Sequence, residues 1–322
     1  MNTQQINRNA EKNKCLYCYL PLNENEIDFH LNCSKIFFGT NKIPEIEFGL
    51  DEIENLAIKV LGRSISLTGV QPKLSIELSK ENKGKNRLTI VGLWGNFILK
   101  PPYSRYPEMP EIEDLTMHLA ELFGIKTAKH SLIRLKSGEL AYISKRFDRL
   151  KSSKLHLEDM AQITELLTER KYFGSMEKVG KTILKYSNYA GNDAIRFFEL
   201  TLFCFVTGNA DMHMKNFSLL ANEEEEITLS PAYDLLSTKL LMPEDKDELA
   251  LTLNGKKNNF GKKDFDLLSE ELGITFKAKE NIYKNIFSSI SRFNEMINIS
   301  FLKEETKLNF EKIIKERVKR IL

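Results

Sequence analysis

The sequence has no apolar run of about 18 residues, the length that a membrane-crossing helix requires. Its first residues, MNTQQINRNAEKNK, also have no apolar stretch of the kind found in a secretory signal peptide. These absences predict a cytoplasmic protein with no membrane partner. The 322 residues are enough for one large or two medium domains with a substantial core.

A strong excess of one charge is also missing. The chain has 47 Lys and Arg against 45 Asp and Glu, for a formal net charge of +2 at pH 7. Proteins that bind nucleic acid or acidic membranes over much of their surface carry a larger basic excess. The overall balance therefore does not support direct nucleic-acid binding, although it leaves local patches open.

Cysteine is scarce, with four residues in the chain. Cys204 lies inside the apolar run FFELTLFCFV, where a reduced core thiol is the simplest interpretation. The other three combine with a histidine in the pattern C-x2-C-x11-H-x2-C, which is formed by Cys15, Cys18, His30 and Cys33. Two close pairs of soft ligands suit a closed tetrahedral zinc site, and a reducing compartment favours metal over disulfides.

We predict a structural Zn²⁺ ion at this N-terminal cluster, because a segment of about 25 residues with few core residues needs a cross-link, such as a bound metal ion, to be stable. The alternative is a pair of reduced, half-buried thiols beside a surface histidine and cysteine. Between residues 15 and 39, Lys35 is the only Lys or Arg, against three acidic residues. A nucleic-acid finger is therefore not expected, and a rigid clip or a docking face for a protein partner fits better.

Hydrophobic periodicity separates a strand-rich part of the chain from a helix-rich part. Between residues 64 and 149, five short runs separated by turn residues predict an antiparallel sheet: KLSIEL, RLTIV, NFILK, HSLIRL and LAYISKRF. The helix MPEIEDLTMHLAELFG interrupts them, with Pro110 near its start and Gly124 at its end. A short helix is predicted at GLDEIENLAIKVLGRS, and residues 159–322 are predicted to be mainly helical.

The order of these elements predicts an α+β fold with two lobes. We expect a Cys/His zinc-binding module at residues 1–40, a lobe built on the antiparallel sheet at 41–157, and a helical lobe at 158–322.

The stretch GNADMHMKNFSLL contains the pattern D-x-x-x-x-N, formed by Asp211 and Asn216. This is the spacing of a protein-kinase catalytic loop, in which the Asp accepts a hydroxyl proton and the Asn holds a magnesium ion. Asp234, in SPAYDLLS, follows a strand-like run and is placed to be a second magnesium ligand. The DFG motif of ordinary kinases is absent from the sequence.

Such a site also needs a cation for the nucleotide phosphates. Lys100, at the end of the apolar strand NFILK, is the candidate, although a strand-end Lys taken alone is more often a solvated charge. Glu113 on the following helix is the best candidate to pair with it, as a helix Glu pairs with the kinase Lys. Glu111 is an alternative, and either acid could simply belong to the first turn of the helix.

The predicted phosphate loop is SISLTGVQPKLSI, where Gly69 would allow close approach of the backbone to a ligand. It contains neither G-x-G-x-x-G nor the P-loop pattern, so composition alone predicts a tight turn.

Taken together, these stretches resemble the HipA family of serine/threonine kinases, the toxins of bacterial toxin-antitoxin modules. The matching motifs follow one another over about residues 50–322: S-x-x-G-x-Q-x-K at 66–73, FILKPP, IEDLTMHLA, KRFDR, LEDMAQ, GNADMHMKNFSL and SPAYDLLS. The resemblance implies a protein-kinase-like (HipA-type) fold that uses ATP and Mg²⁺.

Carried over to this sequence, the resemblance implies that Asp211 is the catalytic base and that Asn216 and Asp234 hold magnesium. The backbone of residues 158–160 would meet the adenine, and residues 68–73 would cover the phosphates. The residues expected at the nucleotide are Thr68, Gly69, Val70, Gln71, Pro72, Lys73, Lys100, Glu158, Asp159, Met160, His213, Lys215, Asn216, Tyr233 and Asp234.

Two groups of residues within these motifs keep a second interpretation. The alternative for His213 is a buried structural histidine, but its position two residues from the proposed base favours a role in the site. For Arg146, Asp148 and Arg149, an ion-paired strand end accounts for the residues as well as a functional role does.

In this family a serine of the phosphate loop is an autophosphorylation site. Ser66 matches that serine and Thr68 matches a second one found in HipT-like members, while Ser64 is a competing candidate. A phosphate brings about 1.5 to 2 negative charges, which would repel nucleotide phosphates from the loop. The resemblance therefore implies inactivation by autophosphorylation.

Longer HipA proteins have about 100 residues before the loop, whereas 65 residues precede Ser66 here. On this basis the chain resembles the short HipT-like form, and the expected partners are a small separate protein like the missing subdomain and a DNA-binding antitoxin. Family substrates are aminoacyl-tRNA synthetases, whose phosphorylation arrests translation and growth. The competing hypotheses are a small-molecule kinase on the same fold and a pseudokinase that acts as a binding module.

Overall fold

The computed structural model describes the chain except for residues 1–12, 54, 56–71, 81–85, 92–93 and 151–152. The predicted phosphate-loop residues Ser66 to Gln71, with Ser64, lie outside the described part, and so does most of the helix predicted at residues 49–64. The chain divides into two compact units. The first comprises residues 1–114, 128–147 and 299–302, and the second comprises residues 115–127, 148–298 and 303–322.

The first unit contains the predicted sheet. Its strands are β1 (Glu45–Ile46), β2 (Leu74–Lys80), β3 (Asn86–Ile90), β4 (Phe97–Lys100), β5 (His130–Arg134) and β6 (Leu140–Lys145). Among the described residues their order is β1-β3-β2-β4-β6-β5. All pairings are antiparallel apart from the short β1, which runs parallel to β3. The five predicted strands are therefore confirmed, and β1 adds an edge that the periodicity did not indicate.

One buried face of this sheet is formed by Ile76, Leu99, Ile133 and Ile143, which come from four different strands and are at most 3 % exposed. The strand β5 is buried on both faces. The helix α2 (Leu31–Phe38) of the N-terminal module packs on this sheet, because the rings of Phe37 and Phe38 lie 5.7 and 5.9 Å from that of Phe97 in β4. The Cys/His segment therefore shares the core of the first unit.

The predicted interrupting helix is α5 (Met109–Phe123). It ends at Gly124, whose φ of 101° lies in a region that residues with a Cβ rarely adopt. Its first residues, through Asp114, belong to the first unit, and the rest belong to the second.

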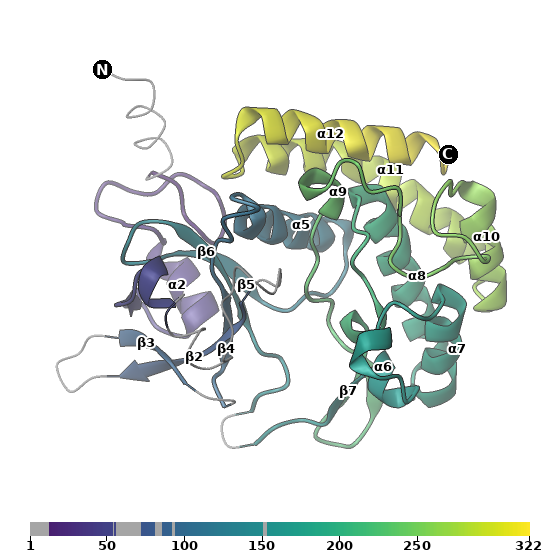
Figure 1. The fold of residues 1–322 in the computed structure, drawn as a ribbon, viewed down its shortest axis with the longest axis horizontal. Helices are drawn as coiled ribbons and strands as arrows, with labels where there is room; N and C mark the ends of the chain where they lie inside the picture. Colours follow the sequence, from purple (N-terminus) through teal and green to yellow (C-terminus); the bar gives the residue numbers. More distant parts are fainter. Residues whose placement is uncertain (1–12, 54, 56–71, 81–85, 92–93, 151–152) are drawn as a thin grey trace. The chain divides into compact units, whose positions relative to one another are not determined.

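The second unit is mainly helical, as predicted (Figure 1). Its helices are α6 (Met160–Ile163), η1 (Thr168–Arg170), α7 (Met176–Tyr186), α8 (Ala190–Thr207), η2 (Met214–Asn216), α9 (Thr238–Leu241), α10 (Lys262–Glu271), α11 (Phe276–Ile299) and α12 (Glu304–Lys319). The most apolar of the predicted helices, α8, is buried along most of its length and packs against α7, α10 and α12. Cys204 is a fully buried thiol within it, as expected.

A small antiparallel sheet also lies in the second unit. It consists of β7 (Leu157–Asp159), β8 (Ser218–Ala221) and β9 (Ile227–Leu229), in that order. Of these strands, the sequence had indicated only the last. No helix of the described residues combines the length and apolar character needed to cross a bilayer.

Candidate active site

The stretch GNADMHMKNFSLL connects α8 to β8. The helix ends at Gly208, whose φ is 72°, and a Cβ at this position would lie 2.9 Å from the Cβ of Lys239. Beyond it, the side chains of Met212, Met214 and Phe217 are buried and alternate with the polar residues. These apolar side chains anchor the loop in the core and thereby limit the positions that its polar groups can take.

The two ends of the D-x-x-x-x-N pattern are tied together. The Nδ2 of Asn216 donates to the main-chain oxygen of Asp211 (2.9 Å), and the Asp211 amide donates to Asn209 Oδ1 (3.0 Å). Because the side-chain nitrogen of Asn216 makes this contact, the side-chain oxygen Oδ1 is the atom suited to bind a metal ion.

Tyr172 makes the most direct contact with the Asp211 carboxylate. Its hydroxyl donates to Asp211 Oδ1 at 2.7 Å. Burial and this carboxylate raise the pKa of Tyr172, so the phenol stays protonated and acts as the donor. No motif of the sequence pointed to Tyr172, which lies 39 positions before Asp211.

His213 is buried beside this pair, with its ring edge-on to Tyr172 at 5.0 Å. Burial lowers the pKa of His213 below its ordinary 6.5, while the carboxylates of Asp211 and Asp234 act in the opposite direction. A neutral ring is consistent with its Nδ1, which accepts a hydrogen bond from the Lys215 amide (3.3 Å). His213 thus lies within electrostatic reach of both carboxylates.

Asp234 has a left-handed backbone with a φ of 60°, which is uncommon for a residue with a side chain. The preceding Tyr233 donates its hydroxyl to the main-chain oxygen of Lys215 (3.0 Å) and lies 2.5 Å from Ser218 Oγ. Since a phenol has one proton, Ser218 is the donor in the second bond. Tyr233 therefore connects the segment before Asp234 to the catalytic-loop stretch.

The predicted hinge residues lie in β7 and at the start of α6. Glu158 is opposite Leu219 of β8, and the Met160 amide donates to the Phe217 oxygen (2.9 Å). Because antiparallel hydrogen bonds alternate along a strand, Leu157 and Asp159 direct their main-chain groups away from β8. Asp159 also caps α6 by accepting from the Gln162 amide (2.9 Å).

The first unit contains the expected ion pair. Lys100 Nζ lies 2.5 Å from Glu113 Oε1, and the two residues are only 4 % and 1 % exposed. Glu113, one of the two acids considered, thus pairs with Lys100. The ammonium is also 5.4 Å from the centre of the Tyr142 ring, which further stabilises its charge.

The remaining candidates are placed as follows. Pro72 is buried and Lys73 is exposed, directly before β2. Arg149 Nη1 lies 2.8 Å from Asp148 Oδ2, the ion pair of the structural interpretation. Asp211, His213, Asn216 and Asp234 belong to the second unit, whereas Lys100 and Glu113 belong to the first. The roles of all these residues toward a nucleotide stay predictions.

A family model described as the HipA-like C-terminal domain matches residues 65–296 of this chain. The chain belongs to this HipA-like family. The match contains the Lys100 and Glu113 pair as well as the residues around Asp211 and Asp234.

Curated relatives of this HipA-like chain carry the word kinase in their names, in each case with a qualifier that leaves the activity open. Y4dM of Sinorhizobium fredii is 33% identical over 231 residues, which cover 68% of this chain and 54% of the relative. A Haemophilus influenzae protein is 26% identical over 241 residues, covering 70% of this chain and 68% of that protein. The chain spans about half the length of the Sinorhizobium relatives, since Y4mE is covered over 56%.

Solved structures that share the fold include the following two. A chain in the complex of the toxin-antitoxin proteins HipA and HipB with operator DNA from Shewanella oneidensis matches with a TM-score of 0.66 and 21% identity, over 80% of this chain and 65% of that one. The Helicobacter pylori proinflammatory kinase CtkA matches with a TM-score of 0.51 and 17% identity, over 70% of this chain and 87% of CtkA. At these identities the matches show the fold alone.

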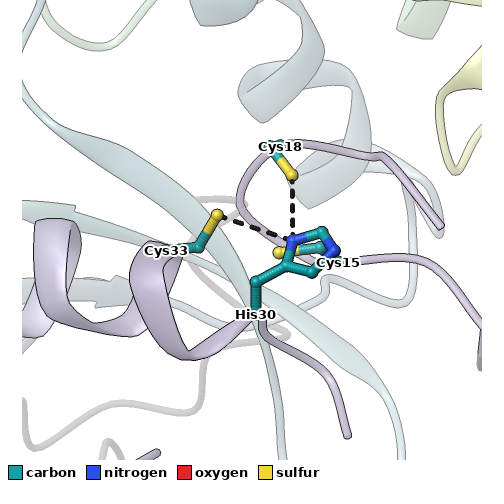
Figure 2. Close-up of side chains that lie close together, drawn as sticks. All are labelled: Cys15, Cys18, His30 and Cys33. Carbon is teal, nitrogen blue, oxygen red and sulfur yellow. Dashed lines mark hydrogen bonds between the residues drawn. The ribbon is translucent and has the colours of Figure 1, made fainter. Parts of the chain in front are cut away.

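The Cys/His cluster of this HipA-like chain lies outside the family match. Figure 2 shows Cys15, Cys18 and Cys33 around His30, and all four ligand atoms lie within 4.8 Å of one another. His30 Nδ1 is 3.4 Å from Cys18 Sγ and 3.6 Å from Cys33 Sγ. A tetrahedral zinc site places such atoms about 3.5 to 3.8 Å apart, given bonds of about 2.0 Å to nitrogen and about 2.3 Å to sulfur.

The second nitrogen of His30 supports the same interpretation. Its Nε2 lies 2.9 Å from the main-chain oxygen of Pro21, which fixes the proton on Nε2 and leaves Nδ1 toward the thiols. Histidines that bind metals commonly donate their other N–H to a carbonyl or carboxylate in this way. The pKa of Cys15 is lowered to about 5, chiefly by a hydrogen bond from Cys18, against the effect of burial. The cluster could therefore hold a metal ion.

Proposed function

We propose that this HipA-like chain is an ATP- and Mg²⁺-dependent serine/threonine protein kinase. The observation that supports this most strongly is the arrangement around Asp211. Asn216 is bonded to its main chain, Tyr172 holds its carboxylate, and His213 lies within electrostatic reach of both Asp211 and Asp234. A carboxylate base and two oxygen ligands in one compact unit are what phosphoryl transfer requires.

In this proposal Asp211 accepts the proton of a serine or threonine hydroxyl. The hydroxyl oxygen forms a bond to the γ-phosphoryl group while the bond to the β-phosphate oxygen breaks, with ADP as the leaving group. Asn216 Oδ1 and the Asp234 carboxylate would hold magnesium, which supplies neutralisation of the phosphate charge. Lys100, oriented by Glu113, would fix the phosphates.

We further propose that the main chain of β7 meets the adenine. Glu158 lies opposite Leu219 of β8, and the Asp159 amide donates to Gln162 Oε1 (3.0 Å), so Leu157 is the β7 residue whose main-chain groups face away from these contacts toward a ligand. Residues 68–73 would cover the phosphates, with Ser66 or Thr68, or alternatively Ser64, as the autophosphorylation site.

The biological part of the proposal is a growth-inhibiting toxin that acts in the cytoplasm and is restrained by an antitoxin. The fold shared with a protein found in a HipA and HipB complex supports an antitoxin partner. An aminoacyl-tRNA synthetase is the proposed substrate class, on the family resemblance alone. We retain residues 1–40, 41–157 and 158–322 as the proposed module and lobes.

Labelled ATP with purified protein tests the enzymatic proposal. We expect Mg²⁺-dependent labelling of the protein itself, with phosphate on Ser66 or Thr68 by mass spectrometry. Asp211→Asn keeps the shape of the side chain but removes the base, and we expect it to reduce labelling by at least about a hundredfold. Transfer to a metabolite without self-labelling would indicate a small-molecule kinase, and absence of Mg²⁺-dependent ATP binding would indicate a pseudokinase.

We also propose that Cys15, Cys18, His30 and Cys33 bind a structural Zn²⁺ ion. The ligand spacing and the hydrogen bond from His30 Nε2 to Pro21 fit a closed site without an open coordination position. Elemental analysis should find one zinc ion per chain, and Cys15→Ser should lose it. Metal-free wild-type protein that is fully folded would refute the assignment.

A further inference from the structure

Tyr19 directly follows the ligand Cys18 and reaches into the core of the first unit. Tyr19 is only 1 % exposed, and its hydroxyl donates to Asp114 Oδ2 at 2.6 Å. Its φ of 63° lies in the left-handed region, which is unfavourable for a tyrosine. The surrounding turn must therefore hold it, and hydrogen bonds from the Tyr19 amide to Cys15 O and from the Cys15 amide to Leu20 O close that turn (both 2.9 Å).

Asp114 is the point where the Cys/His module meets α5. It is fully buried, and its second oxygen lies 2.6 Å from Nδ1 of His130 in β5. Two contacts from different parts of the first unit thus fix this carboxylate. The next residue toward the helix N-terminus is Glu113, the partner of Lys100. Because neighbouring helix residues are related by a fixed rotation and a rise of about 1.5 Å, holding Asp114 also sets the position of Glu113.

The module is attached to the first unit at further points. The oxygen of Leu16 accepts hydrogen bonds from the Leu132 amide (3.2 Å) and from Ser131 Oγ (3.1 Å), both in β5. The Tyr19 ring packs edge-on against Phe301 at 5.0 Å, in the turn between α11 and α12 that belongs to this unit. The metal-ligand loop therefore packs against the same core as α5.

We propose that the metal-filled Cys/His cluster positions the Lys100 and Glu113 pair through Tyr19 and Asp114. The bound ion holds the turn from Cys15 to Cys18, the turn directs Tyr19 to Asp114, and Asp114 holds the start of α5. Loss of the metal then loosens Glu113 from Lys100 and lowers phosphoryl transfer. This inference rests on the proposed zinc site and the proposed kinase function.

Hydrogen exchange measured by mass spectrometry tests this positioning without any need for activity. Removing zinc from the full chain should speed amide exchange at residues 109–114 by about tenfold, and Tyr19→Phe should do the same while it keeps its zinc. Ser34→Ala is the matched control, because Ser34 is buried in the same module and donates to the Thr40 oxygen (2.8 Å) instead. Exchange in α8 serves as the internal reference for global unfolding.

The kinetic arm compares the rate of self-labelling at saturating ATP. We expect zinc removal and Tyr19→Phe each to lower the rate constant of self-labelling by about tenfold. The two changes together should have little further effect because they act on the same contact. Unchanged exchange at residues 109–114 in zinc-free protein, or additive effects on this rate constant, would overturn the inference. A zinc-loaded wild type without transfer activity would refute the kinase proposal, and the exchange data would still decide the positioning.

Discussion

Glu113→Gln tests the buried ion pair that the proposed site depends on. The substitution keeps the shape of the side chain but leaves the Lys100 ammonium, only 4 % exposed, without the carboxylate 2.5 Å away. Removing one partner of a buried pair typically costs about 3 to 5 kcal/mol, because the remaining charge stays buried after losing its counter-ion. With a urea slope of about 2 kcal/mol/M, a loss of about 4 kcal/mol lowers the unfolding midpoint by about 2 M.

Urea unfolding followed by circular dichroism, with exchange at β4 and α5 to identify the first unit, measures this loss. Glu139→Gln is the control, since Glu139 is exposed in the same unit and the change should stay within about 0.5 kcal/mol. Combining Lys100→Met with Glu113→Leu should recover part of the stability but not phosphoryl transfer. A cost below about 1 kcal/mol for Glu113→Gln would refute the reasoning, because it would mean that Lys100 is well solvated.

Two further predictions concern the second unit. Burial favours the neutral form of Glu248, but hydrogen bonds from Arg320 and the positive charge of Arg317 lower its pKa below the ordinary 4.5. The folded state then binds fewer protons than the unfolded state, so the stabilisation is present above about pH 4.5 and is lost as the pH falls through the lowered value. In thermal unfolding at pH 7, the free energy of unfolding of wild type should be about 2 kcal/mol higher than that of Glu248→Gln, and this difference should shrink below pH 4.5. A difference that stays constant with pH would contradict this assignment. Tyr172→Phe removes the donor to Asp211 and should lower the rate constant of self-labelling at saturating ATP by about tenfold, with little change in the KM for ATP. An unchanged rate constant would show that the loop alone positions the base.

Local sequence patterns predicted the strands, the main helices and several candidate residues, because their information is short-range. Alternating apolar residues indicated the strands from Leu74 to Lys145, and Asp211 and Asn216 were recognisable by a spacing of five positions. The cysteine spacing likewise indicated a cluster whose ligand atoms lie together in the structure.

The contacts that position those residues came only from the tertiary structure. Tyr172 lies 39 positions from Asp211, and Tyr19 lies 95 positions from Asp114, so no local period relates the members of either pair. The pairing of β7 with β8 similarly joins segments about 60 residues apart, and it decides which main-chain groups face outward. Residue type and spacing along the chain were enough to identify which side chains could take part in phosphoryl transfer. Only the folded chain decided which neighbours hold them, because side chains distant in sequence meet through packing.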